Sequence, residues 1–564
     1  MILGIDLGTT NSLVSYFDGE SSKIIPNKLG ENITPSVVAI DDNGQVLVGK
    51  TAKEYGFIHP ESVASVFKRT MGTDKKYSLG GKEYTSEELS AFVLRSLKED
   101  AEAFLNEKVE EVVISVPAYF NDKRRKATKR AGELAGLKVE RIISEPTAAA
   151  IAYGLLKENV NASYLVFDLG GGTLDVSILE LFDNILEVRA VAGDNYLGGE
   201  DFTEVLMTRF IEKNEIALEK LTEKEYIIIR DAAERAKLDL SKTNEVSFEA
   251  TISGETKSLT ITADEYEKLC EPLLDRIKKP VQRSLADAHI KLSDLNEIVL
   301  VGGATKLPLV RNFITKLFKK FPDTSINPDE AIAMGAAIQA ALKARNEAVK
   351  EVILTDVCSF TLGTEVSVER ANGYYEAGHF LPIIDRNTVI PASRTERLYT
   401  LRDDQTEIRI KVLQGESRFA ENNLLLGVMN IKVPKNKAGE EAIDVTYTYD
   451  INSLLEVQVK IVSTGEIKKQ IIKGKDNEMT PEEIHDRMKE LSYLKIAPRD
   501  QEENRLLLLR GERLYEEASG RDREMIDIWL RNFEDVLKRQ NREEIEESRR
   551  DLKEKFKNFV ENRY

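Results

Sequence analysis

Residues 165–177 read LVFDLGGGTLDVS, an apolar run followed by three glycines between Asp168 and Asp175. Glycine lets backbone N–H groups approach a ligand closely, and converging N–H groups form a nest whose usual guest is a phosphate. Because residues 173–179 (TLDVSIL) alternate in polarity, they predict a returning strand, and hence a hairpin bent around an anion. A tight hairpin without a ligand is the alternative.

The same arrangement occurs near the N-terminus. Residues 2–14 read ILGIDLGTTNSLV, again an apolar strand, an aspartate (Asp6), a glycine turn and hydroxyl side chains. Two copies predict a duplicated fold whose halves face each other around one polyphosphate. Asp6 and Asp168 would then lie beside the phosphates, where Mg²⁺ binds while keeping most of its waters. The alternative is that both aspartates only cap turns.

Two further segments fit a nucleotide site. Residues 297–310 (EIVLVGGATKLPLV) predict a buried strand that ends at Gly302 and Gly303 and is followed by a helix. Residues 230–241 (RDAAERAKLDLS) place Glu234, Lys237 and Ser241 three and four positions apart, on one face of a predicted helix. By itself, such a charged face is usually only solvated.

Length, charge and cysteine content restrict the class of protein. A chain of 564 residues is too long for one core, so we expect at least two domains. A net charge of −17 argues against general binding to nucleic acid or to anionic membranes. Two cysteines cannot make a disulfide framework, no stretch is apolar enough to span a bilayer, and residues 1–12 lack a basic leader. We therefore expect a cytoplasmic location.

Eight segments together resemble one family, the seventy-kilodalton heat-shock protein (DnaK-type) family of molecular chaperones, within the wider actin-like and sugar-kinase-like ATPases. The resemblance covers nearly the whole chain, and the segments occur in the family's order. They are GIDLGTTNS (4–12), VPAYFNDKRRKATKRAGELAG (116–136), SEPTAAAIAYG (144–154), FDLGGGTLDVS (167–177), GDNYLGGEDF (193–202), ERAKLDLS (234–241), VLVGGATKLP (299–308) and INPDEAIAMGAAIQA (326–340).

The resemblance implies the members of a nucleotide site. The implied catalytic residues are Lys68, Glu145, Asp168, Thr173 and Asp175, and the implied magnesium residues, acting through water, are Asp6 and Asp168. The implied nucleotide-binding residues are Gly8, Thr9, Thr10, Asn11, Gly170, Gly171, Gly172, Thr173, Gly198, Gly199, Glu200, Glu234, Lys237, Ser241, Gly302, Gly303, Ala304, Lys306 and Asp329. Lys306, Ala304 and Tyr196 depart from the family's usual residues, which puts nucleotide affinity in doubt more than activity.

The resemblance also implies a multidomain fold. We expect an α/β actin-like, duplicated ATPase domain over 1–350, a linker over 351–356, an all-β sandwich that binds substrate over 357–473, and a short α-helical lid over 474–564. In the linker, VILTD (352–356), Thr355 stands where the family usually has leucine; an ordinary buried strand is the alternative. Thr480, Pro481 and Glu483 predict the first capped helix of the lid.

Three further features follow from the resemblance. The implied groove for an extended apolar peptide contains Phe360, Leu362, Leu401, Ile408 and Ile410. The alternative is that these apolar residues, which alternate with polar ones along the predicted strands, belong only to the core of the sandwich. Thr364, Ser367 and a long aromatic loop over 369–385 depart from the family's pattern. The implied allosteric relay contains Pro117, Arg125, Arg141 and Asp356; for Arg141 the alternative is a plain solvated arginine. The short lid, Thr355 and the altered groove look like the bacterial heat-shock cognate C branch.

The function that the resemblance implies is an ATP-dependent chaperone with slow Mg-ATP hydrolysis coupled to peptide affinity. Its cofactors would be ATP or ADP and Mg²⁺, with K⁺ left open. Its partners would be unfolded or specific client polypeptides, a J-domain co-chaperone and, left open, a nucleotide exchange factor, but neither nucleic acid nor membrane. A small-molecule kinase of the same superfamily, an actin-like polymer and a non-hydrolysing nucleotide-regulated binder are the alternatives.

Overall fold

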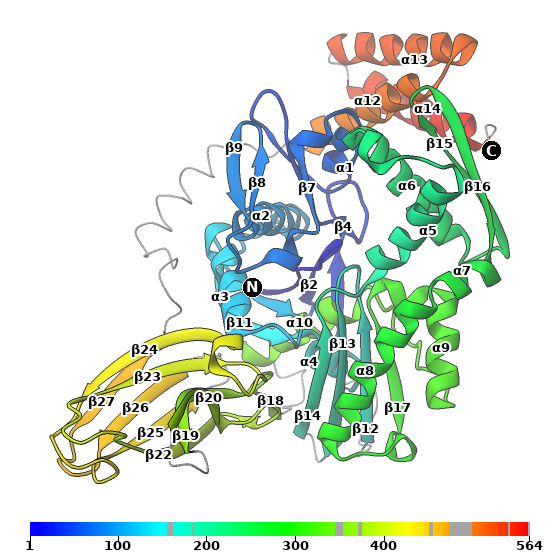
Figure 1. The fold of residues 1–564 in the computed structure, drawn as a ribbon. Coiled ribbons are helices and arrows are strands. Elements are labelled where there is room, and N and C mark those ends of the chain that lie inside the picture. Colours follow the sequence, from blue (N-terminus) through cyan, green and yellow to red (C-terminus); the bar gives the residue numbers. More distant parts are fainter. Residues whose placement is uncertain are drawn as a thin grey trace.

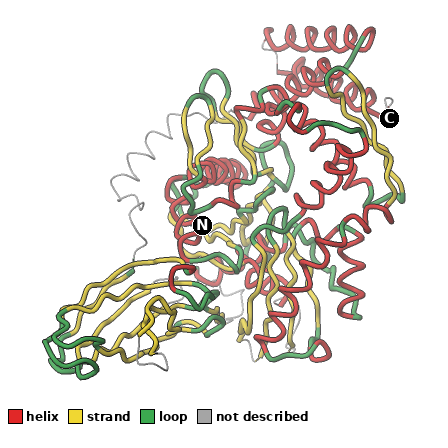
Figure 2. Tube along the Cα trace, in the orientation of Figure 1, coloured by secondary structure: helices red, strands yellow, loops and turns green. Residues whose placement is uncertain are grey.

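The computed structural model describes residues 1–154, 162–182, 185–344, 353–369, 375–449, 455–472, 499–539 and 542–561. The predicted cap at Thr480, Pro481 and Glu483 lies outside these ranges, as do the first two linker residues, Glu351 and Val352. Along the chain, a mixed α/β region is followed by a β region and then by helices, as the sequence predicts (Figures 1 and 2). No helix among the described residues is long and apolar enough to cross a membrane.

Two large sheets form the centre of the α/β region. The first has the order β11-β10-β1-β2-β3, with β4 also paired to β2, and the second has the order β17-β12-β13-β14-β18-β21. In both, the first strand of a hairpin has an antiparallel neighbour on one side and a parallel one on the other. The strands are β1 (Ile2–Asp6), β2 (Asn11–Phe17), β3 (Ser22–Ile25), β4 (Thr34–Pro35), β10 (Glu111–Val116), β11 (Lys138–Ser144), β12 (Ala162–Leu169), β13 (Leu174–Phe182), β14 (Ile185–Asp194), β17 (Glu297–Val301), β18 (Ile353–Val357) and β21 (Val389–Ile390).

Two helices pack between these sheets. Helices α4 (Glu145–Gly154) and α10 (Ala331–Lys343) share one core with strands of both sheets. Their sequences are rich in alanine and glycine, which allows a close approach: a Cβ on Gly335 would lie 1.8 Å from the carbonyl oxygen of Ala148. The hairpin ends of the two sheets are thereby held on opposite sides of one space.

The remaining elements of the α/β region cover the outer faces of the sheets in two further cores. Around the first sheet lie α1 (Lys50–Ile58), α2 (Ser86–Leu105), α3 (Asp122–Leu134), β5 (Val37–Ile40), β6 (Val46–Val48), β7 (Val63–Ser65), β8 (Lys76–Leu79) and β9 (Lys82–Thr85). Around the second lie α5 (Gly199–Lys213), α6 (Glu223–Asp239), α7 (Ala263–Leu269), α8 (Glu271–Ala288), α9 (Pro308–Phe318), β15 (Glu245–Ile252) and β16 (Glu255–Thr262).

The β region consists of two four-stranded sheets around a common core. One has the order β20-β19-β23-β24 and the other β22-β25-β26-β27, and the hydroxyl of Tyr447 donates to the carbonyl oxygen of Gly363 in the opposite sheet at 2.9 Å. The strands are β19 (Leu362–Glu369), β20 (Tyr375–Ile384), β22 (Ala392–Tyr399), β23 (Glu407–Gln414), β24 (Leu424–Lys432), β25 (Ala442–Tyr449), β26 (Leu455–Ile461) and β27 (Ile467–Ile471).

One prediction in this region is wrong. Residues 375–384 of the expected long loop are strand β20, which pairs with β19, and residues 370–374 lie outside the described ranges. Tyr375 and Phe380, two of the aromatic residues that suggested an unusual loop, belong to this β-strand, where aromatic residues are common.

The C-terminal helices form a small bundle with its own core. They are α12 (Arg499–Glu517), α13 (Gly520–Arg539) and α14 (Arg542–Glu561). The turn between α12 and α13 ends at Gly520, where φ is 58°. In Figure 1 the bundle lies above the α/β region beside α1, far from the β region. Leu509 of α12 packs into a cluster with Ala52 and Tyr55 of α1.

Candidate nucleotide-binding site

A cavity of about 960 Å³ lies where the hairpins of the two large sheets face each other. The predicted residues that line it are Asp6, Gly8, Thr9, Thr10, Asn11, Lys68, Glu145, Asp168, Gly170, Gly171, Thr173, Gly199, Glu200, Glu234, Lys237, Ser241, Gly302, Gly303, Ala304, Lys306 and Asp329. Gly172, Gly198 and Asp175, which were also predicted, lie directly behind this lining.

The glycines let the two hairpin turns approach each other. A Cβ on Gly171 would lie 2.2 Å from Cγ2 of Thr10, and one on Gly172 would lie 2.6 Å from Cγ2 of Thr9. Gly198 is equally crowded, since its Cβ would lie 2.4 Å from the backbone nitrogen of Gly172. The glycine run therefore has a steric reason, and the two turns face one shared space.

Three aspartates lie buried at the inner end of the cavity. Asp168 and Asp175 are register partners in the β12–β13 hairpin, and Ser115 donates to Asp6 at 2.9 Å. Burial, and next the charge of Glu145, raises the pKa of Asp6 to about 7 and that of Asp175 to about 7. The same two causes raise the pKa of Asp168 well above its usual value. Such a crowd of carboxylates favours a cation among them.

Lys68 supplies one cation. Its ammonium nitrogen lies 2.7 Å from Oε1 of Glu145, and both side chains are buried. Lys68 belongs to a short turn (Phe67–Thr70) beside the first sheet, whereas Glu145 begins helix α4. The ion pair brings two of the predicted catalytic residues together from segments 77 positions apart.

The carboxylates also fit a magnesium ion. Oδ2 of Asp168 is buried and has no hydrogen-bond partner among the described residues. No group of three or more direct ligands was found within those residues, so the donor set suits an ion held mainly by water and phosphate oxygens. Asp6 and Asp168 are the two side chains placed to orient such waters.

The opposite end of the cavity is formed by α6, α5 and the turn after β17. Lys237 donates to Glu234 at 2.7 Å, to Thr203 at 2.8 Å and to the carbonyl oxygen of Gly199 at 3.0 Å. Although burial acts to raise it, the pKa of Glu234 is lowered by Lys237. Ser241 lies just beyond the end of α6 rather than on its face, yet it still lines the cavity.

Sequence reasoning missed two cations that join the two sides of the cavity. Arg69 donates to the carbonyl oxygen of Gly172 at 3.0 Å and to Asp201 at 2.8 Å. Lys53 of α1 pairs with Asp231 of α6 at 3.1 Å. The only local signal was the position of Arg69 next to Lys68, because the partners of both cations lie far away in the sequence.

The turn after β10 connects the cavity with the start of the β region. The backbone N–H of Tyr119 donates to Asp175 at 2.9 Å, while the Tyr119 ring lies against Phe360 at 4.5 Å. Ser359 donates to the carbonyl oxygen of Ala118 at 2.8 Å. Arg125 donates to two carbonyls of the same turn, which begins at the buried Pro117.

The predicted linker is a β-strand in this structure. β18 pairs in parallel with β14, with Thr355 opposite Glu187, and then in antiparallel with β21, with Asp356 opposite Ile390. Arg141 is half-buried, and burial lowers its pKa while Asp356 acts to raise it. Arg141 is therefore not a fully solvated arginine, and the charge of Asp356 acts on it.

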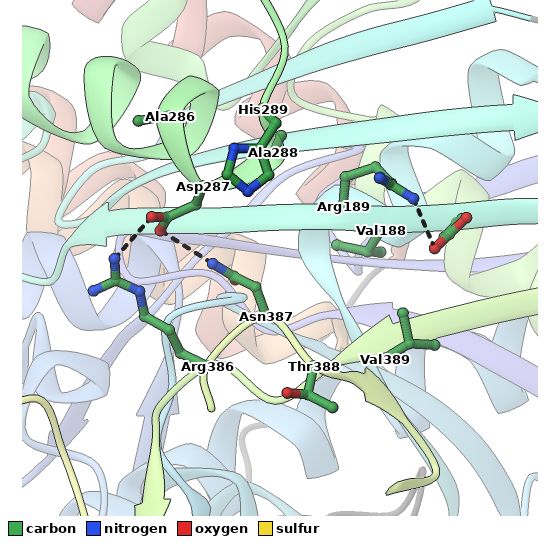
Figure 3. A pocket seen from close by; sticks show the side chains of 11 residues that line it. Val188, Arg189, Ala286, Asp287, Ala288, His289, Arg386, Asn387, Thr388 and Val389 are labelled. Carbon is green, nitrogen blue, oxygen red and sulfur yellow. Dashed lines mark hydrogen bonds and ion pairs between the residues drawn. The ribbon is translucent and has the colours of Figure 1, made fainter. Parts of the chain in front are cut away.

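Below the linker, the loop before β21 lies against the end of α8. Figure 3 shows a pocket of about 400 Å³ there, with Asp287 between two side chains of the β region. Arg386 donates to Asp287 at 2.8 Å and Asn387 donates to it at 3.1 Å. Neither contact has a local sequence signal, since the partners lie about a hundred residues apart.

Three of the five predicted groove residues share the core of the β region, and the other two lie outside it. Leu362 and Ile410 are fully buried in the core between the two sheets, and Ile408 packs against that core. Phe360 contacts Tyr119 of the α/β region instead, and Leu401 is exposed at a strand end. Thr364 is also buried.

Comparison with known proteins identifies the family. The family model described as Hsp70 protein matches residues 2–79 and 74–564. The chain is 42% identical over 497 residues to the chaperone protein DnaK of Thermotoga neapolitana, which covers 86% of this chain and 82% of the relative. It is also 42% identical over 487 residues to the chaperone protein DnaK of Thermosipho africanus, covering 84% and 80%. These matches show that the chain belongs to the Hsp70 family of chaperones.

Proposed function

We propose that this chain is a chaperone that hydrolyses Mg-ATP slowly and couples the nucleotide state to the binding and release of extended apolar segments of client polypeptides. The observation that carries the coupling is the turn after β10, which touches Asp175 through Tyr119 N–H and touches the β region through Ala118 and Tyr119. One backbone turn therefore connects the phosphate end of the cavity with the substrate-binding region, and a change at the phosphate end would act on that region through this turn.

The cavity supports the hydrolysis step. Phosphoryl transfer to water depends mostly on positioning and on neutralising charge. The N–H groups of Gly8–Asn11 and Gly170–Thr173 would cradle the phosphates, and Lys68 would offset charge on the γ-phosphate and position the attacking water. Glu145 holds Lys68 in place, and Asp175 and Thr173 would complete the orientation of water. Mg²⁺, bound through water by Asp6 and Asp168, would supply charge neutralisation.

The linker strand supports the allosteric part of the proposal. β18 pairs with β14 of the α/β region and with β21 of the β region. A shift of either region therefore moves the same strand. Of the proposed relay residues, Asp356 lies in β18 itself, and Pro117 and Arg125 belong to the turn after β10 and the start of α3. By linkage, any effect of nucleotide on peptide affinity implies an equal effect of peptide on nucleotide affinity.

The proposed domain boundaries are those that the family resemblance implies. We propose an ATPase domain to about residue 350, the linker over 351–356, a substrate domain over 357–473 and a lid over 474–564. The proposed groove has less support, because only Phe360, Leu401 and Ile408 of its predicted members lie outside the deep core. A J-domain co-chaperone and a nucleotide exchange factor are proposed as partners from the family alone, and assignment to the cognate C branch stays a prediction.

The test is steady-state ATP hydrolysis with and without a panel of extended apolar peptides. It compares the full chain, a Thr173→Ala variant and a truncation that ends near residue 350. We expect peptide to stimulate only the full chain and the variant to lose hydrolysis. Hydrolysis that ignores every peptide would refute a general chaperone and favour a dedicated client or an obligatory co-chaperone. Phosphorylation of a small metabolite would refute the proposal outright.

A further inference from the structure

A second cavity, of about 790 Å³, lies between the C-terminal helices and the α/β region. It is separate from the proposed phosphate site, although the two share Lys53, Phe57 and Asp231 at their border. Its walls come from α12, α14, α1, α6 and the turn near Leu29, and Figure 1 shows α12 and α14 beside α1. Neither the proposed hydrolysis nor the proposed peptide binding uses this cavity.

Every acid that lines this cavity already has a basic partner. The pairs are Glu31 with Lys50, Glu54 with Arg513, Asp231 with Lys53 and Arg235, Glu503 with Arg549, and Glu517 with Arg513. Seven basic side chains and five acidic ones line the cavity, so the lining carries a surplus of two positive charges.

The surplus is found on Arg510 of α12 and Lys553 of α14. Within the described ranges, neither side chain has a hydrogen bond or an ion pair, and both line the cavity. Burial lowers the pKa of Arg510, the charge of Glu54 acts to raise it, and Arg513 acts to lower it. Burial lowers the pKa of Lys553, as do Arg549 and Lys50, while Glu31 acts to raise it. Arg510 is half-buried and Lys553 is exposed, and a bound anion would give both the direct charge-assisted contact that they lack.

The rest of the lining is apolar. Leu29, Phe57, Leu506, Leu507, Leu514, Phe559 and Val560 contribute side chains from both the C-terminal helices and the α/β region. A cavity of this size that combines charged groups with an apolar part has room for a small molecule that is itself partly charged and partly apolar. An inorganic anion would leave these walls uncovered, whereas an organic anion would cover them.

We propose that this cavity binds a small organic anion, whose acidic group is held by Arg510 and Lys553 and whose apolar body lies against Leu506, Leu507 and Phe559. Because the C-terminal helices and α1 together line the cavity that holds the ligand, its binding stabilises the packing of α12 on the α/β region. This inference does not depend on the proposed ATPase or peptide-binding activity.

The chain contains a reporter for this site. Trp529 is its only tryptophan, and its ring lies 6.2 Å from that of Phe559, which lines the cavity. The experiment is a titration of tryptophan fluorescence in the full chain with octanoate and, separately, with phenyl phosphate. Each titration is repeated with saturating Mg-ADP. The two probes distinguish a carboxylate from a phosphate as the preferred acidic group.

We expect a saturable fluorescence change that Mg-ADP does not abolish. Arg510→Ala and Lys553→Ala, which lie on different helices, should each weaken binding of the preferred probe about tenfold, because each removes a charge-assisted contact. The matched control is Arg531→Ala on the exposed face of α13, where the arginine pairs only with Asp527 in the described structure, and it should bind as the parent does.

Three results would overturn the proposal. One is the absence of any saturable change with both probes at millimolar concentration. Another is unchanged binding in both folded variants, with circular dichroism showing that they retain their helices. The third is displacement of the probe by Mg-ADP, which would place it in the first cavity instead.

Discussion

Asp175 shows how one buried carboxylate makes stability depend on pH. Its pKa is raised to about 7, first by burial and then by Glu145, so between about pH 4 and pH 7 the folded state holds a proton that the unfolded state has lost. The stability contributed by this group is therefore greatest below pH 4 and falls as pH rises to about 7. Above about pH 7, the folded protein holds Asp175 as a buried charge.

We accordingly expect Asp175→Asn to stabilise the nucleotide-free protein. Asparagine keeps an oxygen that can accept from Tyr119 N–H but carries no charge. Its advantage over the parent should grow between about pH 5 and pH 7, by at most about 1.4 kcal/mol per pH unit, and then level off. Thermal unfolding across this range measures it. Parallel stability curves would show that Asp175 does not titrate there.

Gly171 makes a separate steric prediction. Alanine would place a Cβ 2.2 Å from Thr10 Cγ2, so the two phosphate turns must move apart. We expect Gly171→Ala to weaken nucleotide binding at least about tenfold while leaving the fold intact, since only the cavity wall is disturbed. Calorimetric titration with ADP measures this. The control is Gly170→Ala, whose Cβ would lie no closer than 3.8 Å to its neighbours; equal losses would exclude the clash as the cause.

At the scale of the element, the hairpins and the linker could be foreseen for different reasons. The turns at Gly8 and Gly171 were predictable because close backbone approach demands glycine, and that demand is visible in the sequence. The alternation of Leu362 and Ile410 was equally visible, but alternation cannot say which face of a strand meets the core. Both residues lie in the core rather than in an open groove. Residues 375–384 form a strand because pairing with β19 decides what composition alone left open.

The linker strand carries the next prediction. Thr355 lies opposite Glu187 in the parallel pairing of β18 and β14. Thr355→Pro removes a backbone donor and is poorly tolerated within a paired strand. We expect the variant to hydrolyse ATP at its basal rate but to lose at least about four-fifths of any stimulation by peptide. Thr355→Val, which keeps the shape and favours a strand, is the control. Full stimulation in the proline variant would exclude this pairing from the coupling route.

At the scale of the whole molecule, the sequence predicted the separate segments of the site but not the long-range contacts that join them. Nearly every predicted nucleotide residue lines one cavity, because the predicted segments are local and each carries its own glycine or charge pattern. Arg69 with Asp201, Tyr119 with Phe360 and Asp287 with Arg386 join segments roughly a hundred residues or more apart. Such contacts leave no periodic trace, since an arginine in a loop looks the same whether or not a partner lies opposite.

The pair of Asp287 and Arg386 gives the last prediction, because it joins the α/β region to the β region directly. The two side chains lie 2.8 Å apart and are largely shielded from solvent, so reversing one charge places like charges together. We expect Arg386→Glu to loosen the contact and to reduce the stimulation of ATP hydrolysis by peptide several-fold, with an unchanged basal rate. Asp287→Arg alone should act similarly. The double variant restores opposite charges and should recover most of the coupling.

The measurement is peptide-stimulated hydrolysis in all four proteins, together with fluorescence transfer between labels on the two regions. Additive losses in the double variant would mean that each residue acts through other partners, such as Glu416 beside Arg386, rather than through the ion pair itself.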